Sequence, residues 1–386
     1  MSPVEATSAI RKTALNAVHH QLGAKMVEFN GWEMPVEYPA AIGCGIIAEH
    51  MAVRTAAGIF DVSHMGDIQI AGPQALSAVQ HISMNDASRL AVGQAQYSAL
   101  LYPEGTFVDD VVVHRLGEDE YLLVINAGTR EKDFNWVRDH TLEFDCTVRN
   151  LSDDFTQIAV QGPKAVRLVE EYTGTDLSGV RFYWFTFVEM ELAGGRKKPI
   201  LTARTGYTGE DGFEIYLPSD PATSAQAWNR LLELGKRLGA LPCGLGARNT
   251  LRLEARLPLY GHEISDTINV WEAGLDRFCK MEKPDFIGRE ALGERKREPL
   301  QRTLVGLEMT GRGIARDGHP VQDTGGKQIG YVTSGSPAPF LKKNIALGYV
   351  PPERSAPGTE LRVEIRGQGV AAKVVPTPFY RRPKHS

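Results

Sequence analysis

Two segments of the sequence place acidic residues beside apolar residues of the kind that form strands. The first carries Asp109-Asp110 directly before Val111–Val113, and the second runs from Arg204 through a glycine-rich stretch to Glu214. A carboxylate is costly to bury unless a positive group or a hydrogen-bond donor meets it. Two such carboxylates in one pocket would suit a ligand rich in N–H donors, and pterins are ligands of that kind.

Each of these carboxylates also admits a purely structural interpretation. Successive strand residues point to opposite faces, so alternation lets only one of Asp109 and Asp110 face a given pocket. Either could instead cap backbone amides where a polar turn meets the strand. Glu214 alternates with the apolar Phe213 and Ile215, which indicates a carboxylate in the interior. It could serve a ligand or form an ion pair with an arginine of the fold.

A third candidate residue lies on an expected helix at 246–257. Arg248, Arg252 and Ala255 follow the helical spacing i, i+4, i+7. Arg248 falls in the first turn, where the helix macrodipole disfavours a cation. This conflict points to an anionic or carbonyl partner for Arg248, although the residue types are equally compatible with a surface arginine.

Several kinds of site lack support in this sequence. We find no GxGxxG, GxxxxGK[ST], HExxH or GxSxG motif, so dinucleotide, P-loop, zinc-protease and hydrolase-elbow sites are disfavoured. The ten histidines show no metal-ligand spacing, and we expect no metal. The chemistry must then rest on carboxylates, arginine and a substrate that is itself reactive.

Composition and charge limit the classes of partner and the cellular compartment that we expect for this protein. The chain has 42% hydrophobic and 23% charged residues and a net charge of −4, which is too small to argue for nucleic acid or a membrane surface. No stretch approaches the roughly 18 apolar residues of a membrane helix, and Met1–His20 lacks the apolar core of a signal peptide. The four scattered cysteines form no CxxC motif and indicate reduced thiols in a cytoplasmic protein.

The pattern of elements changes along the 386 residues. Residues 1–292 mix strands and helices, and residues 293–302 are charged and contain a proline, as a linker should. The elements expected before the linker include a hairpin of strands at 108–114 and 121–126 and helices at 129–140 and 223–238. After the linker, residues 303–386 read as short strands between turns, which predicts a small all-β barrel or sandwich. These strands are expected at 303–309, 328–333, 345–350, 360–365 and 370–375.

An ordered set of motifs from about residue 25 to 379 resembles the aminomethyltransferase, or T-protein, family of the glycine cleavage system. No single motif would suffice, but the ordered combination is specific. The motifs are FDVSHMG (60–66), YSAL (97–100), VDDVVV (108–113), NAGTREKD (126–133), VQGP (160–163), TGYTGEDGFE (205–214), GLGARNTLRLEA (244–255) and VTSGSP (332–337).

The resemblance implies an α+β fold in a three-domain, cloverleaf-like arrangement around a central folate channel, with the all-β barrel at the C-terminus. It also implies a reaction. An aminomethyl group on the lipoyl arm of H-protein gives its one-carbon unit to tetrahydrofolate, which releases ammonia and forms 5,10-methylenetetrahydrofolate. The implied partners are lipoylated H-protein and tetrahydrofolate as co-substrate, with no metal, nucleic acid or membrane.

Site residues follow from the same resemblance, motif by motif. Asp110, the second aspartate of VDD, matches the catalytic carboxylate near folate N10. Glu214 and Arg248 match folate contacts. The remaining matches are pocket-lining positions: Tyr97, Asn126, Met65 and Tyr207. The chain ends differently from some relatives after Phe379, so no role is carried onto Tyr380.

Two other functions are compatible with this type of scaffold. One is a folate-dependent demethylase acting on a small methylated amine or sulfonium compound. The other is a non-enzymatic folate-binding maintenance factor, whose Lys-Gly-Cys-Tyr-type motif is absent here. The sequence does not specify the surface that would dock H-protein. Two lysine pairs, Lys197-Lys198 and Lys342-Lys343, are either basic contacts for an acidic partner or ordinary surface residues.

Overall fold

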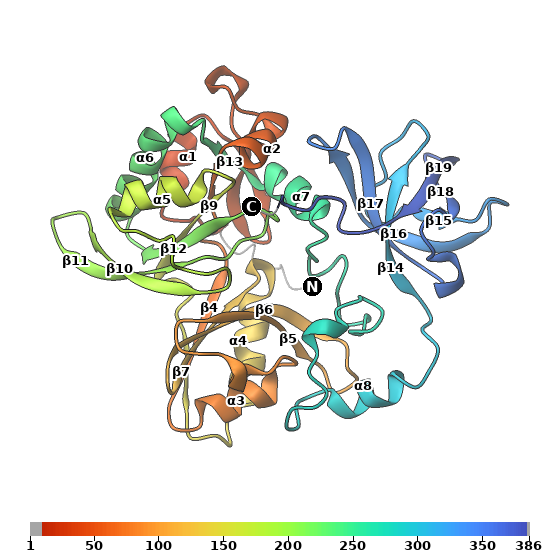
Figure 1. Ribbon diagram of the computed structural model, residues 1–386, viewed down its shortest axis with the longest axis horizontal. Helices are drawn as coiled ribbons and strands as arrows, with labels where there is room; N and C mark the ends of the chain where they lie inside the picture. Colours follow the sequence, from red (N-terminus) through yellow and green to blue (C-terminus); the bar gives the residue numbers. More distant parts are fainter. Residues whose placement is uncertain (1–9, 384–386) are drawn as a thin grey trace, which may run out of the picture.

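The computed structural model describes residues 10–383, and its elements form three lobes around a common centre (Figure 1). The predicted α+β class and the three-lobed arrangement are confirmed. Residues 1–9 and 384–386 lie outside the described residues, and with them the ends of the predicted domains and part of the segment considered for a signal peptide.

The first lobe is built on a six-stranded sheet in the order β10-β11-β12-β9-β3-β13. Helices α5 (Ala165–Thr173) and α6 (Pro221–Gly235) cover one face of it. Along β12, Phe213, Ile215 and Leu217 enter the core on that face. The strands are β3 (Gly58–Asp61), β9 (Phe155–Gln161), β10 (Phe185–Glu191), β11 (Lys197–Ala203), β12 (Gly212–Pro218) and β13 (Leu241–Cys243).

The second lobe is built on a five-stranded sheet in the order β5-β6-β7-β4-β8. The expected hairpin is confirmed as β6 and β7, and the expected helix at 129–140 is α4 (Arg130–Asp139). Val111 and Val113 of β6 enter the core beneath α3 (Ala75–Ile82). The strands are β4 (Gly66–Ala71), β5 (Ala95–Leu101), β6 (Phe107–Gly117), β7 (Glu120–Ile125) and β8 (Thr147–Asn150).

The two sheets share one apolar interface, which on the first sheet lies on the face opposite α5 and α6. Leu122 and Val124 of β7 form a single buried cluster with Leu201, Ala203 and Tyr216 of the first sheet. The burial of apolar area holds these faces together. Side chains on these two faces therefore meet between the lobes.

The chain passes between the two sheets more than once. Strand β3 belongs to the first sheet and β4 to the second, with only residues 62–65 between them. Strand β8 ends in the second sheet at Asn150, and β9 resumes the first sheet at Phe155. The two lobes are thus intertwined in sequence.

The third lobe is a closed six-stranded barrel in the order β14-β17-β16-β15-β18-β19. The five strands expected from the sequence are confirmed. The sixth, β15, spans only three residues and is too short to show alternation. The barrel strands are β14 (Thr303–Met309), β15 (Pro320–Gln322), β16 (Gln328–Ala338), β17 (Lys343–Val350), β18 (Glu360–Ile365) and β19 (Gln368–Val375).

The segment between the first two lobes and the barrel is partly helical. Helix α8 (Arg289–Arg295) covers the first residues of the expected linker, and residues 296–302 follow without helix or strand. The remaining elements are α1 (Asn16–Gln21), β1 (Lys25–Phe29), β2 (Trp32–Glu37), α2 (Ile46–Thr55), α7 (Leu245–Glu254), η1 (Ala40–Ile42), η2 (Ala87–Arg89), η3 (Ala127–Thr129), η4 (Lys236–Leu238), η5 (Asp276–Phe278) and η6 (Pro352–Arg354). Within residues 10–383, no helix has the length and apolar character needed to cross a bilayer.

A buried ionic group ties α2, α7 and the C-terminal tail together at the centre. The guanidinium of Arg54 binds Glu254 at 2.9 Å and Glu210 at 3.0 Å, and it donates to the carbonyl of Thr208 at 2.9 Å. The ring of Tyr380 lies 3.9 Å from the Arg54 guanidinium carbon. The backbone N–H of Tyr380 donates to the Glu254 carbonyl at 2.8 Å.

We predict that Arg54→Met lowers the free energy of unfolding by about 3–5 kcal/mol, because it leaves two buried carboxylates without their cation. Urea unfolding followed by circular dichroism measures the change. Arg230→Met is the control, since Arg230 pairs with Glu233 on the surface at 2.8 Å and should change stability by less than about 1 kcal/mol. Equal losses in the two variants would contradict the central role of Arg54.

Candidate functional site

The predicted site residues gather where the two sheets face each other. Asp110 on β6 lies opposite Ala99 of β5, and Glu214 on β12 lies opposite Ala203 of β11. Paired residues on neighbouring strands share a face of their sheet. Ala203 belongs to the apolar cluster between the sheets, so Glu214 is on the inner face of the first sheet. Val112, two residues from Asp110, packs against the same cluster.

Asp110 is held by two neutral donors. The hydroxyl of Tyr97 on β5 donates to Asp110 Oδ2 at 3.0 Å, and the side-chain amide of Asn126 donates to Asp110 Oδ1 at 2.8 Å. Asn126 directly follows β7, the hairpin partner of β6. The structure therefore brings Tyr97, Asn126 and Asp110 together.

Asp109 is not separated from this group by strand alternation. The same amide nitrogen of Asn126 donates to Asp109 Oδ1 at 2.7 Å, and the Thr129 hydroxyl donates to Asp109 Oδ2. The register shifts where Leu100 and Leu101 pair with Asp109 and Phe107. The shift lies on the N-terminal side of Asp109, and Asp109 and Asp110 themselves pair in regular register with Leu100 and Ala99. Both aspartates nevertheless reach the one amide of Asn126. Asp109 is fully buried, whereas Asp110 is only partly buried.

Burial raises the pKa of Asp110 to about 7, with the neighbouring Asp109 as the next cause. The hydrogen bonds from Asn126 and Tyr97 act in the opposite direction and stabilise the ionised form. A carboxyl group with a pKa near neutrality can take up or release a proton under physiological conditions. It is suited to general acid–base work.

Glu214 sits at the start of β12 after a tight loop. Arg204 closes this loop by binding Asp211 with two hydrogen bonds, at 2.9 and 2.6 Å. Gly212 is required at the entry to the strand, because an added Cβ would lie 2.1 Å from the Val160 carbonyl oxygen. The Thr205 hydroxyl donates to Glu214 Oε2. Among residues 10–383, no donor lies against Oε1.

Burial raises the pKa of Glu214, and the Thr205 hydroxyl and then Arg248 oppose this shift. No ion pair between Glu214 and an arginine is formed within the described residues. The structural alternative of a Glu214–arginine pair is thus not what the fold shows. A buried carboxyl with a free oxygen is an acceptor for a ligand's N–H groups.

Arg248 lies in the first turns of α7, close to Glu214. Its guanidinium carbon lies 4.7 Å from the centre of the Tyr207 ring. Burial lowers the pKa of Arg248, and Tyr207 and Glu214 oppose that shift. Within the described part of the chain, the guanidinium has no hydrogen-bonded partner. Arg248 is therefore not a plain surface residue, and it remains available to an anion or carbonyl.

Tyr207 and Met65 line the same region. The Tyr207 hydroxyl donates to the carbonyl of Pro258, which fixes the ring. Met65 follows the turn after β3 and packs against both the cluster of α2 and α7 and the cluster between the sheets. Its backbone N–H donates to Val62 at 3.0 Å. Met65 thus lies where the chain crosses from the first sheet to the second.

Sequence reasoning missed Tyr183. This residue has a φ of 62°, and its backbone pairs with Arg204 and Ala95, so it joins the two lobes. Burial raises the pKa of Tyr183 to about 12, and the negative charges of Glu214 and Asp110 are the next causes of the increase. Tyr183 therefore lies near both carboxylates. The aromatic run at 182–184 was the only signal in the sequence.

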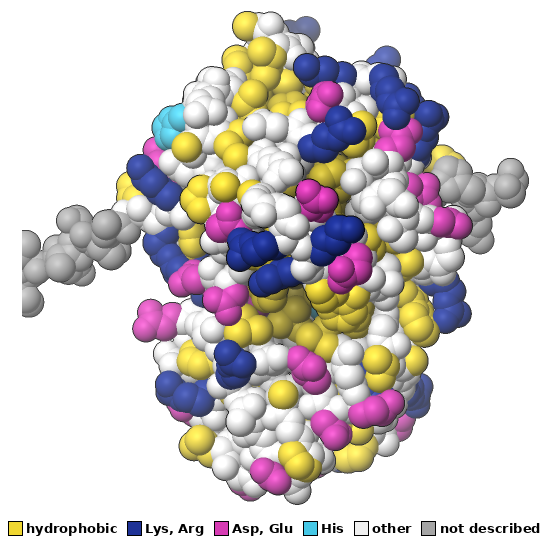
Figure 2. Space-filling model, turned by 90° about the vertical axis from the view of Figure 1, so that its left-hand side faces the viewer, with side chains coloured by type: hydrophobic (Ala, Val, Ile, Leu, Met, Phe, Trp, Pro, Cys, Tyr) yellow, Lys and Arg dark blue, Asp and Glu magenta, His cyan; other side chains and the backbone are white. Residues whose placement is uncertain are grey.

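The candidate basic contacts Lys197-Lys198 and Lys342-Lys343 lie on exposed chain. Lys343 is engaged by Glu308 at 2.8 Å. Lys197 and Lys198 begin β11, the second strand of the first sheet beside the edge strand β10. Strands β10 and β11 lie on the left in Figure 1, the side that faces the viewer in Figure 2. Basic and acidic side chains are interspersed over that face.

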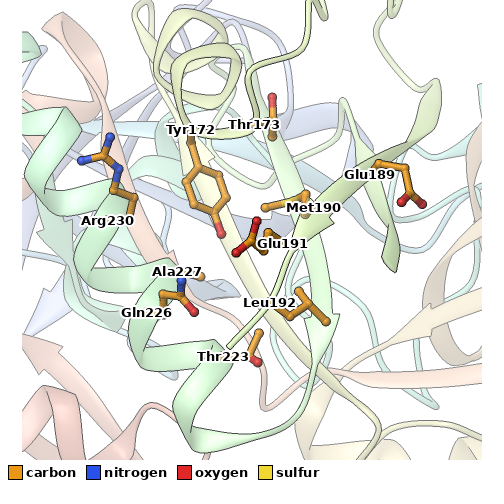
Figure 3. A pocket seen from close by; sticks show the side chains of 10 residues that line it. All are labelled: Tyr172, Thr173, Glu189, Met190, Glu191, Leu192, Thr223, Gln226, Ala227 and Arg230. Atoms are coloured by element: carbon orange, nitrogen blue, oxygen red, sulfur yellow. The ribbon is translucent and has the colours of Figure 1, made fainter. Parts of the chain in front are cut away.

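A surface cavity of about 360 Å³ lies elsewhere, between α5, α6 and β10 (Figure 3). Its lining includes Tyr172, Glu189 and Arg230 and none of the candidate site residues. Within residues 10–383, no group of three or more His, Cys, Asp or Glu side chains is arranged to hold a metal ion.

The arrangement has a definite chemical capacity. One face offers a carboxyl that can exchange a proton near pH 7, and the opposite face offers a carboxyl with a free acceptor oxygen beside an uncommitted guanidinium. Such a site can hold a flat ligand by its N–H and C=O groups. It can also act on a proton at the ligand's other side.

Comparisons with known proteins cover nearly the whole chain. Residues 15–283 match the family model described as GCVT N-terminal domain, and residues 302–381 match the one described as Glycine cleavage T-protein C-terminal barrel domain.

Two relatives named aminomethyltransferase are highly similar. The one from Koribacter versatilis is 65% identical over 384 residues, which is 100% of this chain and 99% of the relative. The one from Acidobacterium capsulatum is 61% identical over 383 residues, which is 98% of each. The crystal structure of the glycine cleavage system aminomethyltransferase T from Bartonella henselae has a TM-score of 0.88 and 34% identity, and the match covers 96% of this chain and 98% of that one.

We predict that Tyr97→Phe raises the pKa of Asp110 by about one unit, because it removes a hydrogen bond that favours the ionised carboxylate. Carbon-13 NMR of aspartate-labelled protein follows the titration. Tyr172→Phe, at the distant cavity, is the control and should leave the pKa unchanged. An unchanged pKa in Tyr97→Phe would show that this hydroxyl does not stabilise the carboxylate.

Proposed function

Since the chain belongs to the glycine cleavage T-protein family, the aminomethyltransferases, we propose that it moves a one-carbon unit from H-protein to tetrahydrofolate. The unit is the aminomethyl carbon held on the lipoyl arm. Ammonia is released and 5,10-methylenetetrahydrofolate is formed. The observation that carries this proposal is the pair of carboxylates, Asp110 and Glu214, on the facing sides of two sheets.

Glu214 and Arg248 are the proposed contacts for the pterin end of the folate. Glu214 Oε1 lacks a donor among the described residues, and pterin N–H groups need acceptors. A buried donor without an acceptor costs about 1–3 kcal/mol. The Arg248 guanidinium offers donors for a carbonyl or carboxylate. Tyr97, Tyr207 and Met65 are proposed to line the pocket around the ring.

Asp110 is the proposed catalytic carboxylate. Folate supplies the nitrogens that take the carbon, so the protein need not supply a nucleophile. The protein must accept an N–H proton and favour positive charge at the carbon while ammonia leaves. An ionised Asp110 can do both, and help of this kind is worth about 10²–10⁴-fold. Asn126 and Tyr97 hold the carboxylate in position for it.

The proposed setting follows from the partners. Lipoylated H-protein brings the aminomethyl group, and the reaction needs neither a metal nor nucleic acid. Cys44, Cys146, Cys243 and Cys279 are all free thiols, which supports a reducing compartment, and we propose the cytoplasm. For the domains we propose a folate-binding region at 1–292, a linker at 293–302 and the barrel at 303–386.

The demethylase alternative has no specific observation in its favour, since relatives with the aminomethyltransferase name are 61% and 65% identical over nearly the whole chain. The experiment is an assay for methylenetetrahydrofolate formed from aminomethyl-loaded H-protein. Free methylated amines and sulfonium compounds serve as control donors. Turnover with H-protein alone supports the proposal, and turnover only with the free donors would overturn it.

We predict that Glu214→Gln weakens tetrahydrofolate binding about 10-fold or more while the fold is retained, because the amide loses the charge and one acceptor that meet the ligand's N–H groups. Calorimetry measures the affinity and thermal unfolding measures the stability. Glu189→Gln, an exposed glutamate on the same sheet, is the control. If stability collapses and the remaining folded protein binds folate normally, Glu214 is a structural residue only.

We predict that Asp110→Asn keeps most folate binding and lowers kcat by about 10²-fold or more, because it removes the charge but keeps the size. Asp109→Asn should be milder on turnover. Steady-state kinetics with loaded H-protein and tetrahydrofolate measure both variants. A near-wild-type kcat for Asp110→Asn, or a larger loss for Asp109→Asn, would remove Asp110 from the catalytic role.

We also predict that kcat/KM rises with pH through about 7 in the wild-type protein. The pKa of Asp110 is about 7, so the carboxyl is protonated and inactive below this pH and ionised above it. The pH profile of kcat/KM reports groups of the free enzyme. In Asp110→Asn, the rise of kcat/KM with pH (the acid limb of the profile) should be absent. Its persistence in the variant would assign the titration to another group.

A further inference from the structure

Behind Asp110 lies a second buried acidic residue that the reaction does not use. Asp133 on α4 is fully buried, and neither of its carboxyl oxygens has a hydrogen-bond donor within the described residues. An ionised carboxylate in this position is costly unless it is compensated. The nearest cation is Lys132, with its ammonium nitrogen 3.5 Å from Asp133 Oδ1.

Asp133 faces Asp109 rather than solvent. The two carboxyl groups lie within hydrogen-bonding reach of each other, and each is among the influences on the other's pKa. Two acceptors in contact explain why Asp133 lacks a donor, since a hydrogen bond between them requires a proton on one. Like-charged carboxylates that share a site resist double ionisation. Burial raises the pKa of both groups.

Asp109 in turn meets Asp110. A single amide nitrogen of Asn126 donates to both, at 2.7 and 2.8 Å, and the backbone N–H of Asp110 donates to Asp109 Oδ1 at 2.8 Å. The three carboxyl groups thus form a continuous row from α4 through β6 to the interface between the sheets. The charge on Asp109 is felt at Asp110, where it raises the pKa.

Other ionisable groups surround this row. Lys132 donates to the Val108 carbonyl and, at 3.1 Å, to the hydroxyl of Tyr260. Its ammonium therefore has several acceptors and does not neutralise Asp133 alone. The remaining ionisable groups that face the row are Tyr97, Tyr102, Tyr183, Tyr207 and Tyr260, and Asp266 lies near Tyr102 and Tyr260.

We propose that Asp109 and Asp133 share one proton at neutral pH and present a single negative charge to Asp110. The inference deepens the proposed function and rests on it for the catalytic consequence. Asp133 and Asp109 are positioning residues, because they act through Asp110 and not on the substrate. The single charge keeps Asp110 titrating close to the working pH, where a carboxyl is most effective in proton exchange.

The proton balance of the proposed reaction explains why Asp110 should titrate near neutral pH. Joining one carbon to two folate nitrogens releases two N–H protons, and the departing ammonia and the lipoyl sulfur take up one each. Asp110 must therefore both accept and return a proton within one turnover. A carboxyl group whose pKa is far above or far below 7 would readily do only one of the two, either accept a proton or return it.

The proton count can be measured without turnover. Infrared spectra of aspartate-labelled protein at pH well above 7 count the neutral aspartic acids. The comparison is between wild type and the double variant Asp109→Asn/Asp133→Asn. We expect the loss of one neutral aspartic acid. Loss of none would mean that both are ionised, and loss of two would mean that both are neutral, and either result overturns the proposal.

The effect on Asp110 is measured by its titration. Carbon-13 NMR should show the pKa of Asp110 falling by about one unit in the double variant, because the neighbouring negative charge is gone. The acid limb of kcat/KM should move to lower pH by the same amount. Asp139→Asn, at the exposed end of the same helix, is the control and should move neither. An unmoved Asp110 titration would overturn the proposal.

Two features keep the test decisive. If the double variant does not fold, Asp133→Asn alone should lose the same single neutral aspartic acid. In that variant Asp109 ionises, because its donors Asn126, Thr129 and the Asp110 backbone N–H are still in place. If the neutral aspartic acid is retained in Asp133→Asn, the proposal is overturned. The NMR and infrared measurements need no substrate. If the protein fails to act on H-protein while both give the expected results, the proposed function fails and the proton sharing stands.

Discussion

The structure depends on the packing of two sheets through their inner faces, with carboxylates in an otherwise apolar interface. Leu122, Val124 and Tyr216 supply the apolar area that holds the faces together. Asp110 and Glu214 occupy the same interface and are deprived of water there. The raised pKa of Asp110 and the free acceptor on Glu214 both follow from that position. Removing the interface would return both groups to ordinary solvated carboxylates.

Much of this arrangement could be predicted from the sequence. The hairpin of β6 and β7, the helix α4 and five barrel strands follow from alternation, helical spacing and turn residues. The candidate site came from the ordered motifs. Tyr183 could not be found in this way, because its proximity to both carboxylates results from the contact between lobes. The reach of one Asn126 amide to both aspartates, although the two alternate along β6, likewise has no signature in the sequence.

A second constraint ties the C-terminal tail, which follows the barrel, to the first lobe. The buried group around Arg54 joins α2, α7, the loop that precedes β12 and the C-terminal tail. The loop that carries Glu210 also carries Tyr207, and α7 carries both Glu254 and Arg248. The ionic group therefore fixes, through short stretches of chain, two residues that we propose as folate contacts. Buried charges of this kind contribute little net stability but make misplacement of any one partner costly.

The passage of the chain between sheets bears on how the protein is made. Gly58 of β3 pairs with Gln161 of β9 on one side and with Leu241 of β13 on the other. During synthesis, β3 leaves the ribosome long before either neighbour exists. The second sheet, from β4 to β8, is complete in sequence before the first can close. We therefore expect the second lobe to assemble first. Until β9 and β13 are synthesised, β3 has unpaired edges that nascent-chain chaperones must shield from aggregation.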